Sequence, residues 1–451
     1  MNFARGGELF GLLVASCAIA GLLGFSGDTP VAAATERSAA PVSASSKAGI
    51  AQLVPKGSPI ASFYGARGFR PFWTDDSAAQ LVEMLGDAEA DGLDPASFPV
   101  EELKRLQAVP NLRPNLDVAL TQAFVSYVRA LRTPAKTEEM VYVDAALAPD
   151  RQEQGLLQSA AAAPSLRAHL NEVRRMHPLY ESLRFALARL RRDGDNGTGL
   201  PDARYEQLLV TNMDRLRALP ANPARRYILV DTASARLWLY ENGQPRDEMR
   251  VIVGKQQMQT PVLAGLIRYA VRNPYWNLPP DLIRARAAEV ARSGPEVLER
   301  EQIELLSGWD ADAWPLDPSE VDWAQVAAGT KKLRMRQLPG ADNMMGSVKF
   351  MLPNRLGIYL HDTPQRGYFA RDDRRLSSGC VRVADAPRLS RWLLQGAEPD
   401  NFGMPEERVD LPEPVPVFLV YLTALPERGK IVVQRDGYNL DKLVKPHSAR
   451  I

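Results

Sequence analysis

A change of hydrophobic pattern near Arg226 divides this chain of 451 residues into two parts with different secondary structure. From about Gln52 to Arg192, apolar residues recur at helical spacing, whereas residues 226–255 alternate with a period of two. One element cannot satisfy both periods, so the pattern predicts helices first and strands later. Residues 281–333 return to a helical, acidic and aromatic character between strand-like segments. The predicted fold class is α+β, with a mainly helical N-terminal scaffold domain followed by a β-rich domain that carries a helical cap insertion.

Local signals support both parts of this prediction. Residues 120–132 and 180–192 are amphipathic segments with basic last turns, as surface helices have. Residues 240–243 (Tyr-Glu-Asn-Gly) form a hairpin turn between two strands. Asp385 caps a short helix that Gly396 ends.

The first 34 residues have the order of a secretory signal peptide. Arg5 precedes an apolar run over residues 9–25, and three alanines follow at 32–34. An uncleaved inner-membrane anchor is the alternative, and it would be the chain's one contact with a membrane. The predicted organisation is a signal peptide at 1–34, a flexible linker at 35–50, a helical scaffold domain at 51–222 and a catalytic domain at 223–451, with the cap at about 281–333.

Several classes of function are disfavoured by composition and missing motifs. The net charge of +1 gives no basic surplus for nucleic acid. Phosphate-binding glycine loops are absent, as are HExxH and CxxC. We therefore predict no nucleic-acid partner, no cofactor and no metal.

Cys380 is the single cysteine that would remain after loss of the signal peptide. One cysteine cannot form a disulfide within its own chain, so this thiol is either a buried apolar residue or a reactive group. A nucleophilic thiol needs a base, and His361 follows the apolar stretch LGIYL nineteen positions earlier. The spacing favours a Cys–His pair without defining a reaction.

The residues around this pair have candidate roles of their own. Gly379 allows a close backbone approach, and its amide together with that of Cys380 could form an oxyanion hole. Tyr359 lies on the same strand face as His361, as an oxyanion or substrate contact or as a core aromatic. Arginines at 366, 371, 374 and 375 form either a solvated loop or a surface for an anionic substrate.

The sequence resembles a known family at these positions. HDTP at 361–364 and SGCVR at 378–382 are similar to the active-site signature of L,D-transpeptidases, the YkuD-type catalytic domain. Residues 250–261, 273–279 and 354–364 resemble the large capped, YcbB-like branch of Gram-negative bacteria, and residues 63–73 resemble its scaffold. Many YkuD-type domains have a histidine at the position of Ser378. The serine agrees with the YcbB-like branch, and it leaves His361 as the candidate base.

The resemblance implies a peptidoglycan enzyme that forms 3→3 cross-links through a Cys380 thioester. Donor and acceptor would both be stem peptides, and the Asp362 backbone carbonyl would orient His361. Candidate substrate contacts are Arg382, Ser378, Ser377, Trp276 and Tyr275, with structural roles as alternatives for Arg382 and the two aromatics. The cap would be packed by tryptophans at 309, 314 and 323. The helical peptidoglycan-binding module usual in this branch has no room between residues 192 and 206.

Other outcomes of the same acyl-enzyme remain open at this point. Water as acceptor gives an L,D-carboxypeptidase or an amidase, and a lysine acceptor attaches a lipoprotein to the wall. A non-catalytic wall-binding scaffold is the alternative from another class, although such a protein would be expected to have lost Cys380 or His361. The predicted location is the periplasm, with other cell-wall enzymes as candidate partners.

Overall fold

The computed structural model describes residues 44–135, 137–194, 198–310, 312–396, 404–427 and 429–441. Its N-terminal part is helical up to Leu216, apart from one short strand. The helices are α1 (Ala44–Leu53), α2 (Pro59–Ala66), α3 (Asp75–Gly86), α4 (Val100–Gln107), α5 (Arg113–Leu131), α6 (Glu153–Ala162), α7 (Leu166–Val173), α8 (Pro178–Asp193) and α9 (Asp202–Leu216).

Helix α1 begins inside the segment predicted to be a flexible linker at 35–50. Ile50 is fully buried in the scaffold core and Val54 nearly so. Two apolar residues four positions apart give the segment a face to bury, which the Ala-Ser-rich composition concealed. The predicted signal peptide at 1–34 and residues 35–43 lie outside the described residues. Within the described part of the chain, no helix has the length and apolar character needed to cross a membrane.

The C-terminal part is built on a ten-stranded sheet that closes on itself. The strand order is β1-β5-β13-β2-β3-β4-β12-β10-β9, β11 pairs with β4, and a further pairing of β5 with β9 completes the ring. The strands are β1 (Val141–Tyr142), β2 (Arg226–Asp231), β3 (Arg236–Glu241), β4 (Gln244–Gly254), β5 (Leu263–Arg272), β9 (Val348–Met351), β10 (Leu360–His361), β11 (Arg375–Ser377), β12 (Val381–Val383) and β13 (Glu407–Val420).

The turn predicted at residues 240–243 joins β3 to β4. Asn242 and Gly243 have φ values of 52° and 73°, and two positive angles are what a type I′ hairpin turn requires. Helix α13 (Ala386–Leu393) is capped as predicted, because the Asp385 side chain accepts a hydrogen bond from the Arg388 N–H at 3.0 Å. Gly396 follows with φ of 84°.

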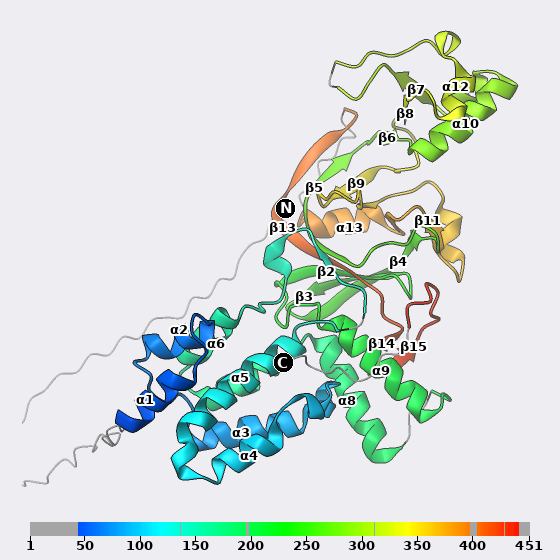
Figure 1. The fold of residues 1–451 in the computed structure, drawn as a ribbon. Coiled ribbons are helices and arrows are strands. Elements are labelled where there is room, and N and C mark those ends of the chain that lie inside the picture. Colours follow the sequence, from blue (N-terminus) through cyan, green and yellow to red (C-terminus); the bar gives the residue numbers. More distant parts are fainter. Residues whose placement is uncertain are drawn as a thin grey trace, which may run out of the picture. The chain divides into compact units, whose positions relative to one another are not determined.

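Alternation along β2 joins the sheet to the scaffold. Tyr227 and Leu229 belong to the same buried cluster as the scaffold helices, whereas Ile228 and Val230 belong to the cluster between the strands. Neighbouring residues of a strand point to opposite faces, so one strand contributes to both cores. Figure 1 shows β2 and β3 next to α8 and α9.

The cap has a small core of its own. It contains α10 (Pro280–Ser293), α11 (Glu296–Arg300), α12 (Trp323–Ala328) and a sheet in the order β6 (Trp276–Asn277), β8 (Arg334–Gln337) and β7 (Ile303–Leu306), drawn in green and yellow in Figure 1. The segment predicted to be helical therefore also holds strand β7. Trp323 packs on the cap core, but the prediction was wrong for Trp309 and Trp314, which are 66% and 65% exposed. Both lie in the loop after β7.

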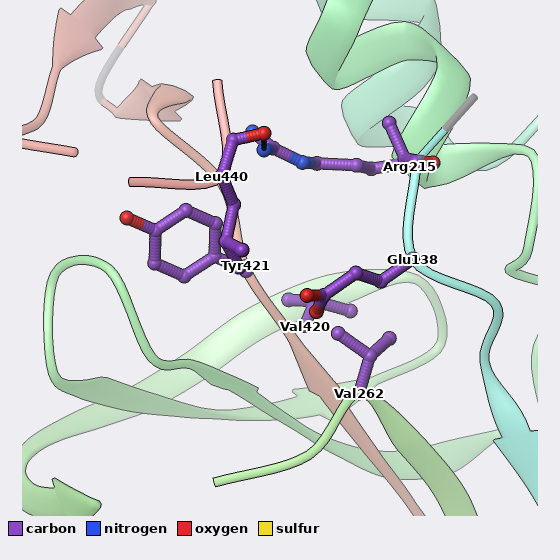
Figure 2. A pocket seen from close by; sticks show the side chains of 7 residues that line it. Glu138, Arg215, Val262, Val420, Tyr421 and Leu440 are labelled. Carbon is purple, nitrogen blue, oxygen red and sulfur yellow. Dashed lines mark hydrogen bonds between the residues drawn. The ribbon is translucent and has the colours of Figure 1, made fainter. Parts of the chain in front are cut away.

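The last described residues return to the scaffold. After the hairpin of β14 (Ala424–Glu427) and β15 (Lys430–Val433), Arg215 of α9 donates hydrogen bonds to the Asp441 carboxylate at 2.8 Å and to the Leu440 carbonyl at 2.9 Å. Figure 2 shows the Arg215 side chain extending toward Leu440 beside a cavity of about 60 Å³. The C-terminal segment is thereby fastened to α9.

Candidate active site

The register of two parallel strands brings Cys380 alongside Tyr359 and His361. Leu360 of β10 is paired with Val381 of β12, and the Val381 N–H donates to the Tyr359 carbonyl at 3.1 Å. Paired residues of neighbouring strands point to the same face. Cys380, one residue before Val381, is therefore on the face that also carries Tyr359 and His361.

The Cys380 thiol is half-buried and donates a hydrogen bond to the Gly357 carbonyl at 3.4 Å. Burial raises the pKa of this thiol, and hydrogen bonding to the Tyr359 backbone and hydroxyl and the charge of Arg382 offset only part of that rise. The sulfur therefore carries its proton at neutral pH. It becomes nucleophilic only when a base removes that proton.

His361 is buried and held through one ring nitrogen. Nδ1 lies 2.6 Å from the Asp362 carbonyl oxygen, which can only accept, so Nδ1 carries the ring proton. Burial and then the charge of Arg382 together lower the pKa of His361 to about 3, against the raising effects of backbone hydrogen bonds to Asp362 and Met345 and of the Asp362 charge. The imidazole is neutral at physiological pH, and Nε2 keeps its lone pair.

Tyr359 interacts with both of these groups. Its ring lies edge-on to the His361 ring with centroids 5.7 Å apart. Burial, and then the charge and hydrogen bond of Cys380, raise the pKa of the Tyr359 hydroxyl. The hydroxyl therefore remains a hydrogen-bond donor next to the sulfur.

The Ser377 hydroxyl holds the backbone on either side of the Gly379–Cys380 peptide bond. Gly379 has φ of 118°, its N–H donates to Ser377 Oγ at 3.1 Å, and Ser377 Oγ in turn donates to the Cys380 carbonyl at 2.6 Å. The Gly379 amide, predicted for an oxyanion hole, thus has a partner inside the loop. The Cys380 N–H takes part in no hydrogen bond among the described residues.

Comparison with known proteins identifies two domains of the chain. Residues 225–416 match the L,D-transpeptidase catalytic domain, and residues 58–187 match the scaffold domain. The chain therefore carries an L,D-transpeptidase catalytic domain behind a scaffold domain. A Haemophilus influenzae protein named "Putative L,D-transpeptidase" is 29% identical over 401 residues, which cover 85% of this chain and 78% of that protein.

Solved L,D-transpeptidases are more distant. A mutant of the Enterococcus faecium enzyme is 15% identical with a TM-score of 0.21, and covers 44% of this chain and 50% of its own. The Mycobacterium smegmatis enzyme is 13% identical with a TM-score of 0.21, and covers 43% and 58%. This chain spans about half the length of these solved structures.

Two of the predicted substrate contacts in this catalytic domain are adjacent and differ in exposure. Ser378 is exposed beside Cys380, whereas Ser377 is buried and uses its hydroxyl within the loop. Ser377 therefore holds the loop in shape, because its hydroxyl binds both the Gly379 N–H and the Cys380 carbonyl.

The remaining predicted contacts have structural partners. Arg382 donates to the Gln365 side-chain oxygen at 2.6 Å. Trp276 packs on the cap core, and the Tyr275 ring lies 3.8 Å from the Arg336 guanidinium. These contacts favour structural roles for the two aromatic residues, which belong to the cap rather than to the strands that carry Cys380 and His361.

The basic loop ahead of Cys380 is mostly a structural feature. Arg374 is buried and donates to the carbonyls of Ser234 at 2.9 Å and Val251 at 3.2 Å. Arg375 pairs with Asp373 at 2.6 Å. These arginines hold the loop against β4, so a fully solvated loop is excluded for them.

Sequence reasoning missed two residues that hold the Cys380 loop. Thr260 Oγ1 accepts from the Gly254 N–H at 2.9 Å and donates to the Gly379 carbonyl at 2.7 Å, while the Tyr438 hydroxyl donates to the Gly254 carbonyl at 2.5 Å. A Cβ at Gly254 would lie 2.1 Å from the Met258 carbonyl oxygen, so only glycine fits. The sole sequence signal was the resemblance of residues 250–261 to the family.

Metal ligands do not gather at this site or elsewhere in the described ranges. No group of three or more histidine, cysteine, aspartate or glutamate side chains could hold a metal ion there. The polar groups available around the thiol are the imidazole, the Tyr359 hydroxyl, backbone amides and the Arg382 guanidinium. That set suits acid–base and acyl-transfer chemistry.

Proposed function

We propose that this protein is a peptidoglycan L,D-transpeptidase that forms 3→3 cross-links between stem peptides through a Cys380 thioester. The observation that supports this most is the strand register that sets Cys380, Tyr359 and His361 on one face of an L,D-transpeptidase catalytic domain. Nucleophile, hydrogen-bond donor and neutral imidazole are the groups that acyl transfer requires.

In the first step, His361 acts as a general base. The sulfur of Cys380 attacks the carbonyl between the third stem residue and the terminal D-alanine, while its proton passes to His361 Nε2. An S–C bond forms, the C–N bond breaks, and the imidazolium returns the proton to the departing amine. A protonated thiol and a neutral imidazole on one strand face favour this route over a preformed imidazolium–thiolate pair.

The tetrahedral oxyanion needs donors that are already in place. Two groups can donate a hydrogen bond to the oxyanion without a rearrangement of the loop: the Tyr359 hydroxyl and the Cys380 N–H. The Gly379 N–H would first have to exchange its bond to Ser377. Losing one oxyanion donor typically costs about 3 to 4 kcal/mol of barrier.

In the second step, the side-chain amine of a second stem attacks the thioester carbonyl. A C–N bond forms, the S–C bond breaks, and the amine's proton returns to the sulfur by way of His361. The substrate polymer lies outside the cytoplasm, so the proposal places the mature protein in the periplasm and assigns residues 1–34 to export.

The first test is the intact mass of the protein after exposure to a carbapenem, a β-lactam that acylates thiols of this family. The expected result is an adduct of one drug mass that is absent in Cys380→Ala and slowed in His361→Ala. Isolated disaccharide-tetrapeptides would then give cross-linked dimers. Folded wild-type protein that forms neither adduct nor dimer would contradict the proposal, and release of D-alanine without dimers would indicate a carboxypeptidase.

A further inference from the structure

The carboxylate of Asp362 has partners on both of its oxygens. Oδ2 accepts from the N–H and the hydroxyl of Ser347, each at 2.8 Å, and Oδ1 accepts from Arg366 at 2.5 Å. The Asp362 N–H donates to the Val348 carbonyl at 2.9 Å, and its carbonyl accepts from His361 Nδ1 at 2.6 Å. Every polar group of this residue is thus bound.

The turn before Ser347 is shaped around that carboxylate. Gly346 has φ of 62°, and a Cβ on it would lie 2.4 Å from the Asp362 carboxyl carbon. A side chain there would displace the carboxylate or the turn. The backbone of residues 346–347 therefore presses directly on the Asp362 side chain.

The carbonyl that accepts from His361 belongs to the backbone, so any residue at position 362 could supply it. The buried Asp362 carboxylate therefore requires an explanation of its own. The Asp362 side chain is 5% exposed, and burying a carboxylate is unfavourable unless hydrogen bonds and a counter-charge replace its hydration. Here three donors hold it, and with the N–H bound as well, little freedom remains for the peptide group that carries the carbonyl.

We propose that the Asp362 carboxylate, clamped by Ser347 and Arg366, is a positioning device that fixes the His361 ring and its tautomer. The proposal rests on the base role of His361 in the proposed function. Ser347, Asp362 and Arg366 act through the imidazole and do not touch the reacting atoms.

Arg366 extends the clamp to the strand of the nucleophile. It also donates to the Ala384 carbonyl at 2.9 Å, just after β12, and so joins the turn after His361 to the segment after Cys380. Arg366 is 49% exposed at its side chain and lines a pocket of about 450 Å³ with Ser347 and Asp362. A small cation can therefore reach the position of its guanidinium.

The first experiment measures the carbapenem acylation rate of Ser347→Ala and Arg366→Ala, with Arg105→Ala as the matched control because its exposed ion pair with Glu102 lies on scaffold helix α4. We expect losses of about tenfold for Ser347→Ala and up to about a hundredfold for Arg366→Ala, as for a misplaced catalytic group. The melting temperature of Ser347→Ala should remain close to that of the wild type, whereas Arg366→Ala should melt lower because the buried Asp362 carboxylate loses its counter-charge. Methylguanidinium should restore the rate of Arg366→Ala but not that of Ser347→Ala, and Arg366→Lys replaces Arg366→Ala if the latter does not fold.

The second experiment records the ¹⁵N resonances of the histidine rings, which does not depend on activity. The chain has four histidines, and His361→Ala assigns the signal. In the wild type, Nδ1 should be protonated and Nε2 bare, whereas both variants should show mixed tautomers. Wild-type ring signals in the two variants would overturn the proposal, whether or not the acylation rates fall. A wild type that forms no adduct would count against the proposed function, while the ring signals would still test the clamp.

Discussion

The hydroxyl of Thr260 donates a 2.7 Å hydrogen bond to the carbonyl of Gly379, the residue before the candidate nucleophile. The same oxygen accepts from the Gly254 N–H at 2.9 Å, so one side chain connects the end of β4 to the Cys380 loop. All of these groups are buried, so water cannot replace the hydroxyl as a hydrogen-bond partner for either backbone group.

Thr260→Val should therefore lower both stability and reactivity. Two buried backbone groups would lose their partner, which costs about 1 to 3 kcal/mol of unfolding free energy for each group. Urea unfolding and the carbapenem acylation rate measure the two effects. Thr260→Ser keeps the hydroxyl and should retain most of both. Equal behaviour of the Val and Ser variants would show that the hydrogen bonds do not hold the loop.

Tyr438→Phe should loosen the same loop from the opposite side. The hydroxyl bond to the Gly254 carbonyl is lost while the stacked ring beside Tyr421 remains, so we expect a decrease of about 1 kcal/mol in unfolding free energy. Hydrogen exchange of residues 254–260 should become faster. Unchanged exchange in this segment would argue against a bracing role for Tyr438.

Gly379→Ala separates backbone conformation from steric clash. A Cβ at this position would meet its nearest atom, Ile358 Cδ1, at 3.5 Å, which is an ordinary contact, but φ of 118° is unfavourable for alanine. We expect a strain of about 1 to 3 kcal/mol and a marked loss of acylation as the loop changes shape. Gly194→Ala is the control, because Gly194 has φ of 67° with open space around it at the end of α8. Equal acylation in both variants would contradict the prediction.

Acid should destabilise the fold through two buried histidines. Burial lowers the pKa of His177 and of His361 to about 3, whereas an unfolded histidine has a pKa of about 6.5. Between pH 3 and pH 6.5, roughly, each of these histidines is protonated in the unfolded chain but not in the folded chain. The free energy of unfolding therefore decreases as pH falls below about 6.5. From pH 7 to pH 5 the loss is about 2 kcal/mol for each histidine.

Chemical unfolding at several pH values checks this effect. His177 Nδ1 accepts from the Leu179 N–H at 3.3 Å, so protonation would also cost a hydrogen bond. His177→Gln should be less stable at pH 7 but should lose less stability on going to pH 5. A pH slope equal to that of the wild type would show that His177 does not contribute.

The acylation rate should be nearly independent of pH between 5 and 8. In this range His361 is a neutral base and the raised pKa of Cys380 keeps the thiol protonated, so the reacting form does not change. Stopped-flow acylation across this range provides the test. A rate that falls tenfold for each unit below pH 7 would indicate a histidine or thiolate titrating near neutrality instead.

The sequence carried the local signals of the fold more fully than its long-range contacts. The period change near Arg226, the turn at Asn242 and the Asp385 cap each depend on neighbouring residues, and the structure confirms the elements they predicted. Strand β7 and the start of α1 at Ala44 were missed, because a short strand and an Ala-Ser-rich helix have weak patterns without their packing partners.

The candidate site likewise has residues that the sequence revealed and contacts that it did not. Cys380 and His361 were visible as rare residues in a recognisable motif, whereas their pairing depends on the register of β10 and β12. Thr260 and Tyr438 could not be found by pattern, since each acts through contacts more than a hundred positions away. Exposure of Trp309 likewise depends on how the cap loop folds.

Strand β13 lies between β2 and β5, yet it comes after every other strand of the ring in the sequence. During synthesis, both neighbours are made long before the strand that joins them. The thiol at Cys380 also precedes Tyr438, which helps to fasten its loop. An incomplete chain therefore lacks an assembled reactive centre, and the order of translation itself delays the chemistry until the protein is whole.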